Sequence, residues 1–159
     1  MIQLTFVTVG TLKEGYLREA LAEYEKRISQ YASVRHVELR EERITDEDDP
    51  KRIEQALAAE GKRILDALPQ DAHKIALCVE GKLLSSPDLA ALIGRAGDER
   101  GKLCFVIGSS HGLAPEVKRA CDTRLSISPM TFPHQLMRVI LSEAVYRSFT
   151  ILAGKKYHK

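Results

Sequence analysis

The chain has 159 residues, of which 44% are hydrophobic and 29% are charged, and its formal net charge is +2. This length suits one domain with a single core, and the composition excludes collagen-like, low-complexity and disordered proteins. No apolar stretch approaches the ~18 residues of a membrane span, and the N-terminus lacks the basic region and cleavage site of a signal peptide. We therefore expect one domain in the cytoplasm, with no membrane partner.

Cysteine usage and charge distribution give little indication of function. The three cysteines are odd in number and lack CxxC spacing, which favours reduced packing residues over disulfides or a zinc site. Acidic residues cluster between Glu38 and Asp49, whereas the last residues include Lys155, Lys156 and Lys159. A nucleic-acid surface would fit such a basic tail, but most charge runs are solvated faces.

Strand and helix patterns alternate from the start of the chain. The apolar, β-branched run 2–9 ends at Gly10 and predicts a buried strand. Apolar residues at three- and four-residue steps over 17–31 predict an amphipathic helix, and 34–40 alternates as a second strand. Asp49 before Pro50 predicts an N-cap and a first-turn proline for a helix that ends at Pro69.

The same alternation continues to the C-terminus. The expected elements are a strand over 74–79, a helix from Ser86-Pro87, a strand over 103–107, a short helix from Pro115, a strand over 124–128 and a final helix over 134–152. This order is typical of an α/β domain in which helices flank a mostly parallel sheet of five strands.

The final predicted helix is apolar on more than one side. One stripe contains Met137, Leu141, Val145 and Phe149, while Val139 and Tyr146 belong to another side. Such a helix is either fully internal or shared with a partner subunit, and its place at the end of a small domain favours a dimer interface.

Ligands of parallel α/β sheets collect at the carboxyl ends of the strands, here the loops after Val79, Ile107 and Ser128. The loop 108–112 is rich in small residues, but it is neither GxGxxG nor a P-loop. Its pattern fits an ordinary turn as readily as a binding loop. A solitary histidine such as His111 or His134 is more often a cap or surface residue than a catalyst. The residues alone therefore indicate an α/β domain with a ligand site at these loops.

A longer motif in the last third of the chain is more specific. The segment 125–141, LSISPMTFPHQLMRVIL, is followed by Glu143, by Tyr146-Arg147 and by the terminal Tyr157-His158-Lys159. Together with matches spread over the whole chain, among them Gly81-Lys82 and Gly112-Leu113, these residues resemble the large-subunit ribosomal RNA methyltransferase H family. That family is the small, single-domain branch of the SPOUT methyltransferases.

The resemblance implies a single SPOUT domain over 1–159, with a trefoil knot, the donor site and the dimer helix in its C-terminal part, about 103–159. It implies methylation of N3 of a pseudouridine in 23S ribosomal RNA of the assembled ribosome, with S-adenosylmethionine as methyl donor and without a metal. The implied partners are a second copy of the chain and ribosomal RNA, not DNA.

The resemblance also assigns residues. It places the methyl donor at Leu77, at Gly108, and along Ile127, Ser128, Pro129, Met130, Thr131 and Phe132. It makes Arg138 and His134 the candidate catalytic residues, because these two lie one turn apart on the same face of the expected final helix. It suggests that Tyr157, His158 and Lys159 contact RNA.

The chain departs from the family pattern at two positions. Many relatives have paired glycines where this chain has Gly108-Ser109, and an acidic residue often follows the leucine where this chain has Cys78. Two other functions remain open at this point. One is a ribosome-binding factor that kept the fold without catalysis, and the other is a nucleotide-dependent oxidoreductase, which the missing dinucleotide fingerprint disfavours.

Overall fold

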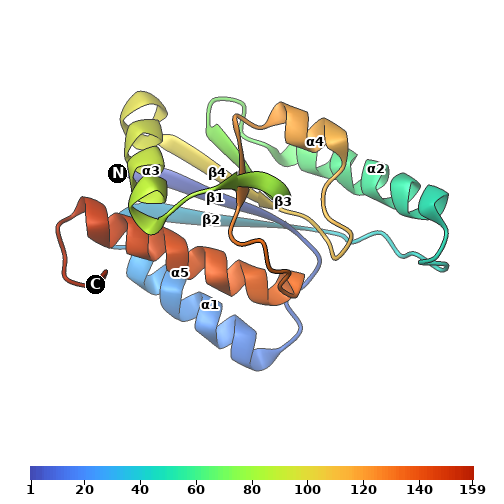
Figure 1. The fold of residues 1–159 in the computed structure, drawn as a ribbon, viewed down its shortest axis with the longest axis horizontal. Coiled ribbons are helices and arrows are strands. Elements are labelled where there is room, and N and C mark those ends of the chain that lie inside the picture. The colour runs from blue at the N-terminus through green and yellow to red at the C-terminus, as the bar shows by residue number, and fades with distance from the viewer.

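The structure is a computed structural model that describes all 159 residues. Five strands and five helices alternate along the chain (Figure 1). In chain order they are β1 (Ile2–Val9), α1 (Gly15–Ile28), β2 (Ala32–Leu39), α2 (Pro50–Ala67), β3 (His73–Leu83), α3 (Ser86–Arg100), β4 (Lys102–Ile107), α4 (Pro115–Ala120), β5 (Thr123–Ser126) and α5 (His134–Leu152). The predicted α/β architecture is confirmed.

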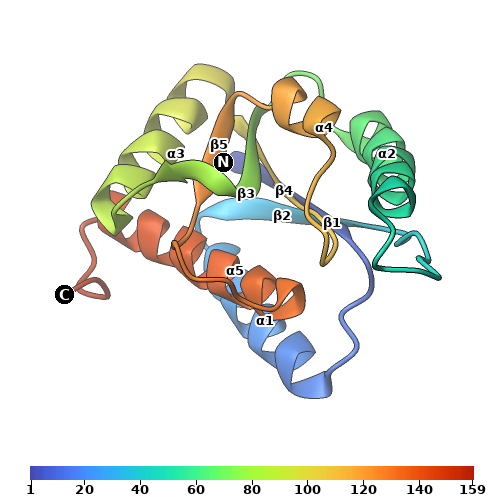
Figure 2. The same ribbon diagram turned by 45° about the vertical axis from the view of Figure 1, so that its right-hand side comes forward.

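All neighbouring strands pair in parallel, in the order β2-β1-β4-β3-β5. Helices cover both faces of this sheet: α1, α3 and α5 lie on one face, and α2 and α4 lie on the other (Figures 1 and 2). Because the strands are parallel, their carboxyl ends meet at one edge, where the candidate loops follow β3, β4 and β5.

Alternating side chains of the central strands fill two separate cores. Leu4 and Phe6 of β1 pack into the core beneath α1, α3 and α5, whereas Val7 and Val9 pack into the core beneath α2 and α4. The strand β4 divides in the same way, since Phe105 belongs to the first core and its neighbours Cys104 and Val106 belong to the second. The period of two in a strand explains why an unbroken apolar run serves a sheet that is covered on both faces.

The N-terminal caps fix where two helices begin. The Asp49 carboxylate accepts a hydrogen bond from the Lys51 amide at 3.0 Å, and Pro50 is the first residue of α2, as predicted. At α3 the cap lies one residue earlier than predicted, because the hydroxyl of Ser85 accepts from the amide of Asp88 at 3.2 Å.

The last two strands differ from their expected bounds. The strand β3 extends to Leu83 instead of ending at Val79, and β5 ends at Ser126, which leaves Ile127 and Ser128 in the following loop. The extension of β3 follows from its pairing: Leu125 of β5 faces both Leu77 and Lys82, so β3 bulges between these two residues and bends across β5. A Cβ atom on Gly81 would lie 2.6 Å from the backbone carbonyl carbon of Leu125, so only glycine fits at this crossing.

Packing within the chain explains both apolar sides of α5. Leu141, Val145 and Phe149 are buried against the sheet, while Val139 packs against the Leu12, Leu17 and Leu21 cluster beside α1. The second apolar side therefore has an intramolecular partner. None of the helices has the length and apolarity that crossing a membrane requires.

The Gly81 crossing generates a test of stability. We expect Gly81→Ala to lower the free energy of unfolding by about 1–3 kcal/mol, because its Cβ meets backbone atoms that no side-chain rotation can move aside. The matched control is Gly15→Ala, whose Cβ would lie 3.7 Å from its nearest neighbour at a position without positive φ. We expect the control to be neutral or stabilising by up to about 1 kcal/mol. Equal urea midpoints for Gly81→Ala and the parent protein would contradict the prediction.

Candidate active site

A cavity of about 640 Å³ opens at the carboxyl ends of β4 and β5, beside the bulged part of β3. Three segments form most of its wall, and α5 contributes His134 and Met137. The segments are 77–80 within β3, 107–113 from the end of β4 onward, and 125–133 from the end of β5 onward. Among residues 125–133, only Pro129 does not line the cavity. Ten of the 22 lining residues are hydrophobic, a mixture that suits a ligand with flat apolar faces and several polar edges.

The loop after β4 is tightly folded and is anchored by a hydrogen bond to a helix. A Cβ atom on Gly108 would lie 2.2 Å from the carbonyl oxygen of Gly112, so the turn closes only around a glycine. The hydroxyl of the next residue, Ser109, donates to the buried carboxylate of Glu60 at 2.9 Å, and that carboxylate also accepts from the Glu42 amide at 2.8 Å. Ser109 thus ties the loop to α2.

The loop after β5 is held by its own serines. The Ser126 hydroxyl donates to the Ser128 carbonyl at 3.1 Å, and the Ser128 hydroxyl accepts from the Met130 amide at 3.0 Å. These local bonds form the kind of turn that serine stabilises. They fix the path of the segment that carries Ile127, Thr131 and Phe132 along the cavity wall.

One ion pair and one thiol lie at the cavity wall. The ammonium of Lys118 in α4 is hydrogen-bonded to Glu80, and it holds the pKa of that carboxyl below its usual range. Burial raises the pKa of the Cys78 thiol, and the nearby Glu80 charge acts in the same direction. Cys78 therefore lines the cavity as a neutral thiol.

Most residues assigned from the sequence meet at this cavity. Leu77 and Gly108 line it, as do Ile127, Ser128, Met130, Thr131, Phe132 and His134. These residues come from three segments that are distant in the chain, and the parallel sheet brings them together. Pro129 lies in the same loop but does not line the cavity.

The side chain of Arg138 does not line the cavity. This side chain is only 5% exposed, and its guanidinium pairs with the Glu38 carboxylate at 2.9 Å and donates to the Gly10 carbonyl at 3.3 Å. These partners lie at the ends of β2 and β1, whereas His134, one turn earlier in α5, faces the cavity. The two residues share a helix but not a surface, and the Nε of Arg138 is buried without a hydrogen-bond partner.

The C-terminal tail folds back on α5, outside the cavity. The Tyr157 hydroxyl donates to Glu143 at 3.0 Å, and the Arg147 guanidinium lies 4.7 Å from the centre of the Tyr157 ring. Arg147 also bonds to the same Glu143 carboxylate and lies 3.2 Å from the Nδ1 of His158. His158 and Lys159 remain exposed.

Sequence reasoning includes 108–112 as a possible binding loop but misses Met137 and Lys118 of the wall. Met137 follows from its position three residues after His134 on a helix that meets the cavity. Lys118 had no signal, because a single lysine on a short helix is usually a surface residue. Lys118 forms its ion pair with Glu80, which lies in the bulged part of β3.

Comparison with known proteins identifies the family of this chain. Residues 2–158 match the family model described as "Predicted SPOUT methyltransferase". A protein of Bacillus pumilus named ribosomal RNA large subunit methyltransferase H is 46% identical, and the match covers 99% of this chain and all of that protein. A protein of the same name from Bifidobacterium adolescentis is 45% identical with the same coverage.

A solved structure shares the fold at much lower sequence similarity. The crystal structure of a probable methyltransferase from Bordetella pertussis superposes with a TM-score of 0.57 at 17% identity, covering 91% of this chain and 95% of that one. The family match over nearly the whole chain, together with the full-length relatives, shows that the chain belongs to the SPOUT methyltransferase family.

Proposed function

We propose that this protein transfers a methyl group from S-adenosylmethionine to N3 of a pseudouridine in 23S ribosomal RNA of the assembled ribosome, in the cytoplasm. The observation that carries the proposal is the cavity at three strand-end loops, in a chain whose full-length relatives are named ribosomal RNA large subunit methyltransferase H. A non-catalytic ribosome-binding factor is disfavoured, because the full-length relatives are named as methyltransferases.

The cavity fits the methyl donor in size and chemistry. Its volume of about 640 Å³ lies within the usual range for small-molecule sites. Leu77, Ile127 and Phe132 offer apolar surfaces for the faces of an adenine, while the turn at Gly108 brings backbone close to the ligand. The donor supplies an activated methyl on its sulfonium, so the residues of the chain have to align the target atom and exclude water.

The residues of α5 act on the RNA base in this proposal. N3 of pseudouridine loses a proton on methylation, and a nearby cation favours that loss by stabilising the anion. His134 faces the cavity and contacts the base. Arg138 provides the positive charge, and its guanidinium exchanges the partly exposed Glu38 carboxylate for the substrate when RNA binds.

The crossing of β3 over β5 supports the proposal of a trefoil knot. A threaded chain requires two backbone segments to pass at close range, and the glycine contact between Gly81 and Leu125 provides such a passage next to the donor cavity. Threaded chains are nearly absent from other folds, which is why the family match contributes most to this proposal.

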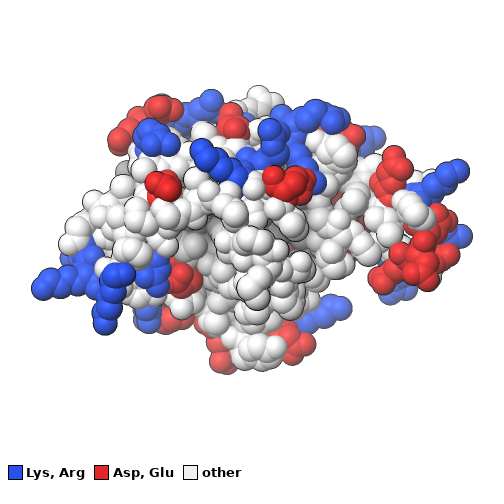
Figure 3. All heavy atoms as spheres, viewed as in Figure 1, with Lys and Arg blue, Asp and Glu red and all other residues white.

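We propose in addition that the protein is a homodimer and that its tail contacts RNA. The face shown in Figure 3 carries a broad uncharged area over α5 and the loop before it. Val79, Leu83, Met130 and Leu136 are large apolar side chains that remain exposed near the cavity. A partner subunit would cover such a surface. His158 and Lys159 are the exposed residues that the tail offers to RNA.

A methyl-transfer assay tests the proposed function directly. Ribosomes from cells that lack the endogenous activity, incubated with the protein and labelled S-adenosylmethionine, are expected to gain one methyl group on a pseudouridine base of 23S RNA. Mass spectrometry of the RNA locates the product. Donor binding without methyl gain would point to another RNA substrate, and no donor binding would favour the non-catalytic factor.

The same assay separates two roles for Arg138. We expect Arg138→Ala to lower kcat/KM by about 100-fold or more, as loss of a group that stabilises developing charge does, while calorimetry shows donor affinity nearly unchanged. The control variant is Glu38→Gln, which removes the charge that competes for the guanidinium. It should retain transfer. If Glu38→Gln lost as much activity as Arg138→Ala, the ion pair would be purely structural and our assignment would be wrong.

Dimerisation is tested by a charge placed on the exposed apolar face. We expect Leu136→Asp to convert the dimer to a monomer in sedimentation equilibrium, because an interface does not tolerate an unpaired buried carboxylate. The matched control is Leu65→Asp on α2, at a leucine of similar exposure: 39% compared with 37% for Leu136. A parent protein that sediments as a monomer, or a Leu136→Asp variant that remains a dimer, would contradict this interface.

A further inference from the structure

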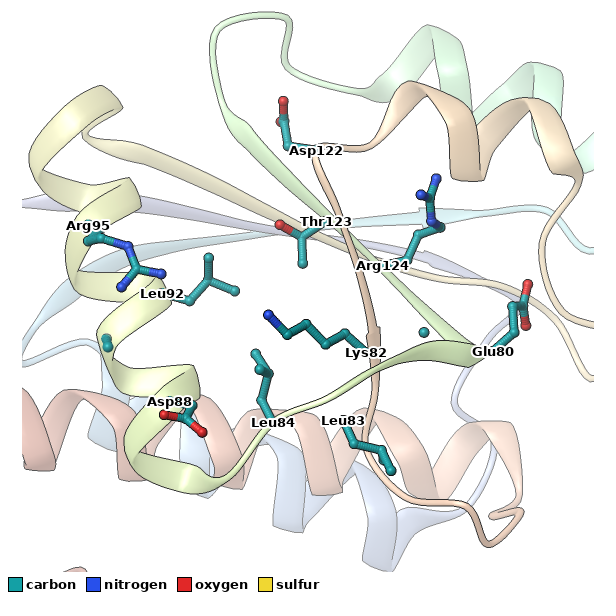
Figure 4. A pocket seen from close by; sticks show the side chains of 12 residues that line it. Glu80, Lys82, Leu83, Leu84, Asp88, Leu92, Arg95, Asp122, Thr123 and Arg124 are labelled. Atoms are coloured by element: carbon teal, nitrogen blue, oxygen red, sulfur yellow. The ribbon is translucent and has the colours of Figure 1, made fainter.

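A second concave surface lies beside the donor cavity, and the proposed chemistry does not use it. It is a groove of about 860 Å³ between α3, the bent end of β3 and the edge strand β5. Figure 4 shows that Lys82 from β3 and Arg95 from α3 extend into the space between these elements, and that Arg124 lies on β5. We call it the basic groove and define it by these three cations.

The cations of the basic groove have no partners within the protein. Lys82, Arg95 and Arg124 are exposed, and none of them takes part in an ion pair or a side-chain hydrogen bond. By contrast, most of the other arginines of the chain are bonded to a carboxylate or a carbonyl, for example Arg63 to Glu42 and Arg147 to Glu143. Three unpaired cations from three different elements therefore line one depression. Lys82 and Arg95 point into it, and Arg124 points away from them on the other side of β5 (Figure 4).

The acidic residues of the groove are already engaged. Glu80 is bonded to Lys118, and Asp88 accepts from the Ser85 hydroxyl at 2.8 Å. Asp122 accepts from the Lys74 amide at 2.8 Å and lies 3.8 Å from Arg100. Lys118 and Arg100 therefore balance Glu80 and Asp122, whereas the neutral hydroxyl of Ser85 leaves the charge of Asp88 in place. Three cations against this one carboxylate give the groove a positive excess.

The position of the groove indicates the kind of anion. It adjoins the donor cavity, since Glu80 lines both, and the β3–β5 crossing separates them. The charges are spread over three elements instead of meeting at one point, which suits a chain of phosphates better than a single one. Lys and Arg gather along the upper part of the face in Figure 3, whereas Asp and Glu gather at its right-hand end. A polyanion that enters the cavity would therefore be drawn over the groove.

We propose that Lys82, Arg95 and Arg124 bind the phosphate backbone of the RNA substrate next to the nucleotide that enters the donor cavity. This inference rests on the proposed function. Contacts of this type position a nucleic acid without reading its sequence, and they release counterions, so binding weakens with salt. The basic groove fixes the register of the RNA, while the cavity residues act on the base.

The test compares two triple variants with the parent protein. In Lys82→Gln/Arg95→Gln/Arg124→Gln we expect the KM for ribosomes to rise at least 10-fold. The slope of log affinity against log salt should fall in magnitude by about 2, which is about 0.7 for each of three contacts to single-stranded RNA. The matched control, Lys26→Gln/Lys51→Gln/Lys62→Gln, removes the same charge from exposed lysines of α1 and α2 and should change KM less than twofold.

Two further measurements keep the outcomes distinct. Calorimetric titration with S-adenosylmethionine should give the same affinity for both triple variants and the parent protein, which shows that the fold and the donor site are intact. If the parent protein fails to methylate ribosomes, the proposed function itself fails. If the parent is active and the groove variant keeps its KM and salt slope, this inference is overturned. A groove variant that binds ribosomes weakly but binds protein-free 23S RNA like the parent would instead assign the groove to an acidic ribosomal protein.

Discussion

The close approach of β3 to β5 is the contact on which both concave surfaces depend. At Gly81 the backbone of β3 passes over Leu125, and the strand bulges so that Leu125 pairs on both sides of the bend. The residues before the bend, Leu77 to Glu80, form a wall of the donor cavity, and the residues after it, Lys82 to Leu84, form a wall of the basic groove. A single glycine therefore allows one strand to serve two surfaces that face different parts of a ligand.

The sequence predicts the sheet well, because the physics of its central strands is local. A strand covered on both faces has to be largely apolar, and the sequences of β1 and β4 meet this condition. The start of α2 is also set locally, by the cap at Asp49 and the proline that follows it. The bend of β3 is different. An isolated glycine in a strand, here Gly81, is only a general signal for a bulge. The bend itself results from pairing with a strand more than 40 residues later in the chain.

The same distinction between local and long-range effects applies to the candidate site. Leu77, Gly108 and Ile127 could be placed together because parallel strands end at one edge of the sheet, so strand order alone brings their loops into contact. The helical spacing of His134 and Arg138 is also correct, but spacing does not say where a long side chain ends. Arg138 reaches the Glu38 carboxylate of β2, a contact that only the folded chain reveals. The tail is a similar case, because Tyr157 is held by Glu143 and Arg147, fourteen and ten residues earlier in the chain.

The net charge of the chain says little about its function. A value of +2 is common among proteins. What matters is which charges are already paired. Glu42 compensates Arg63, and Lys118 compensates Glu80, so these ions hold the structure together and attract little from outside. Three exposed cations without partners, Lys82, Arg95 and Arg124, line the basic groove next to the cavity. An approaching polyanion responds to that local excess, since exposed charges farther away than about 8 Å are largely screened at physiological salt. In the proposed function, this arrangement draws RNA toward the cavity without requiring a basic protein.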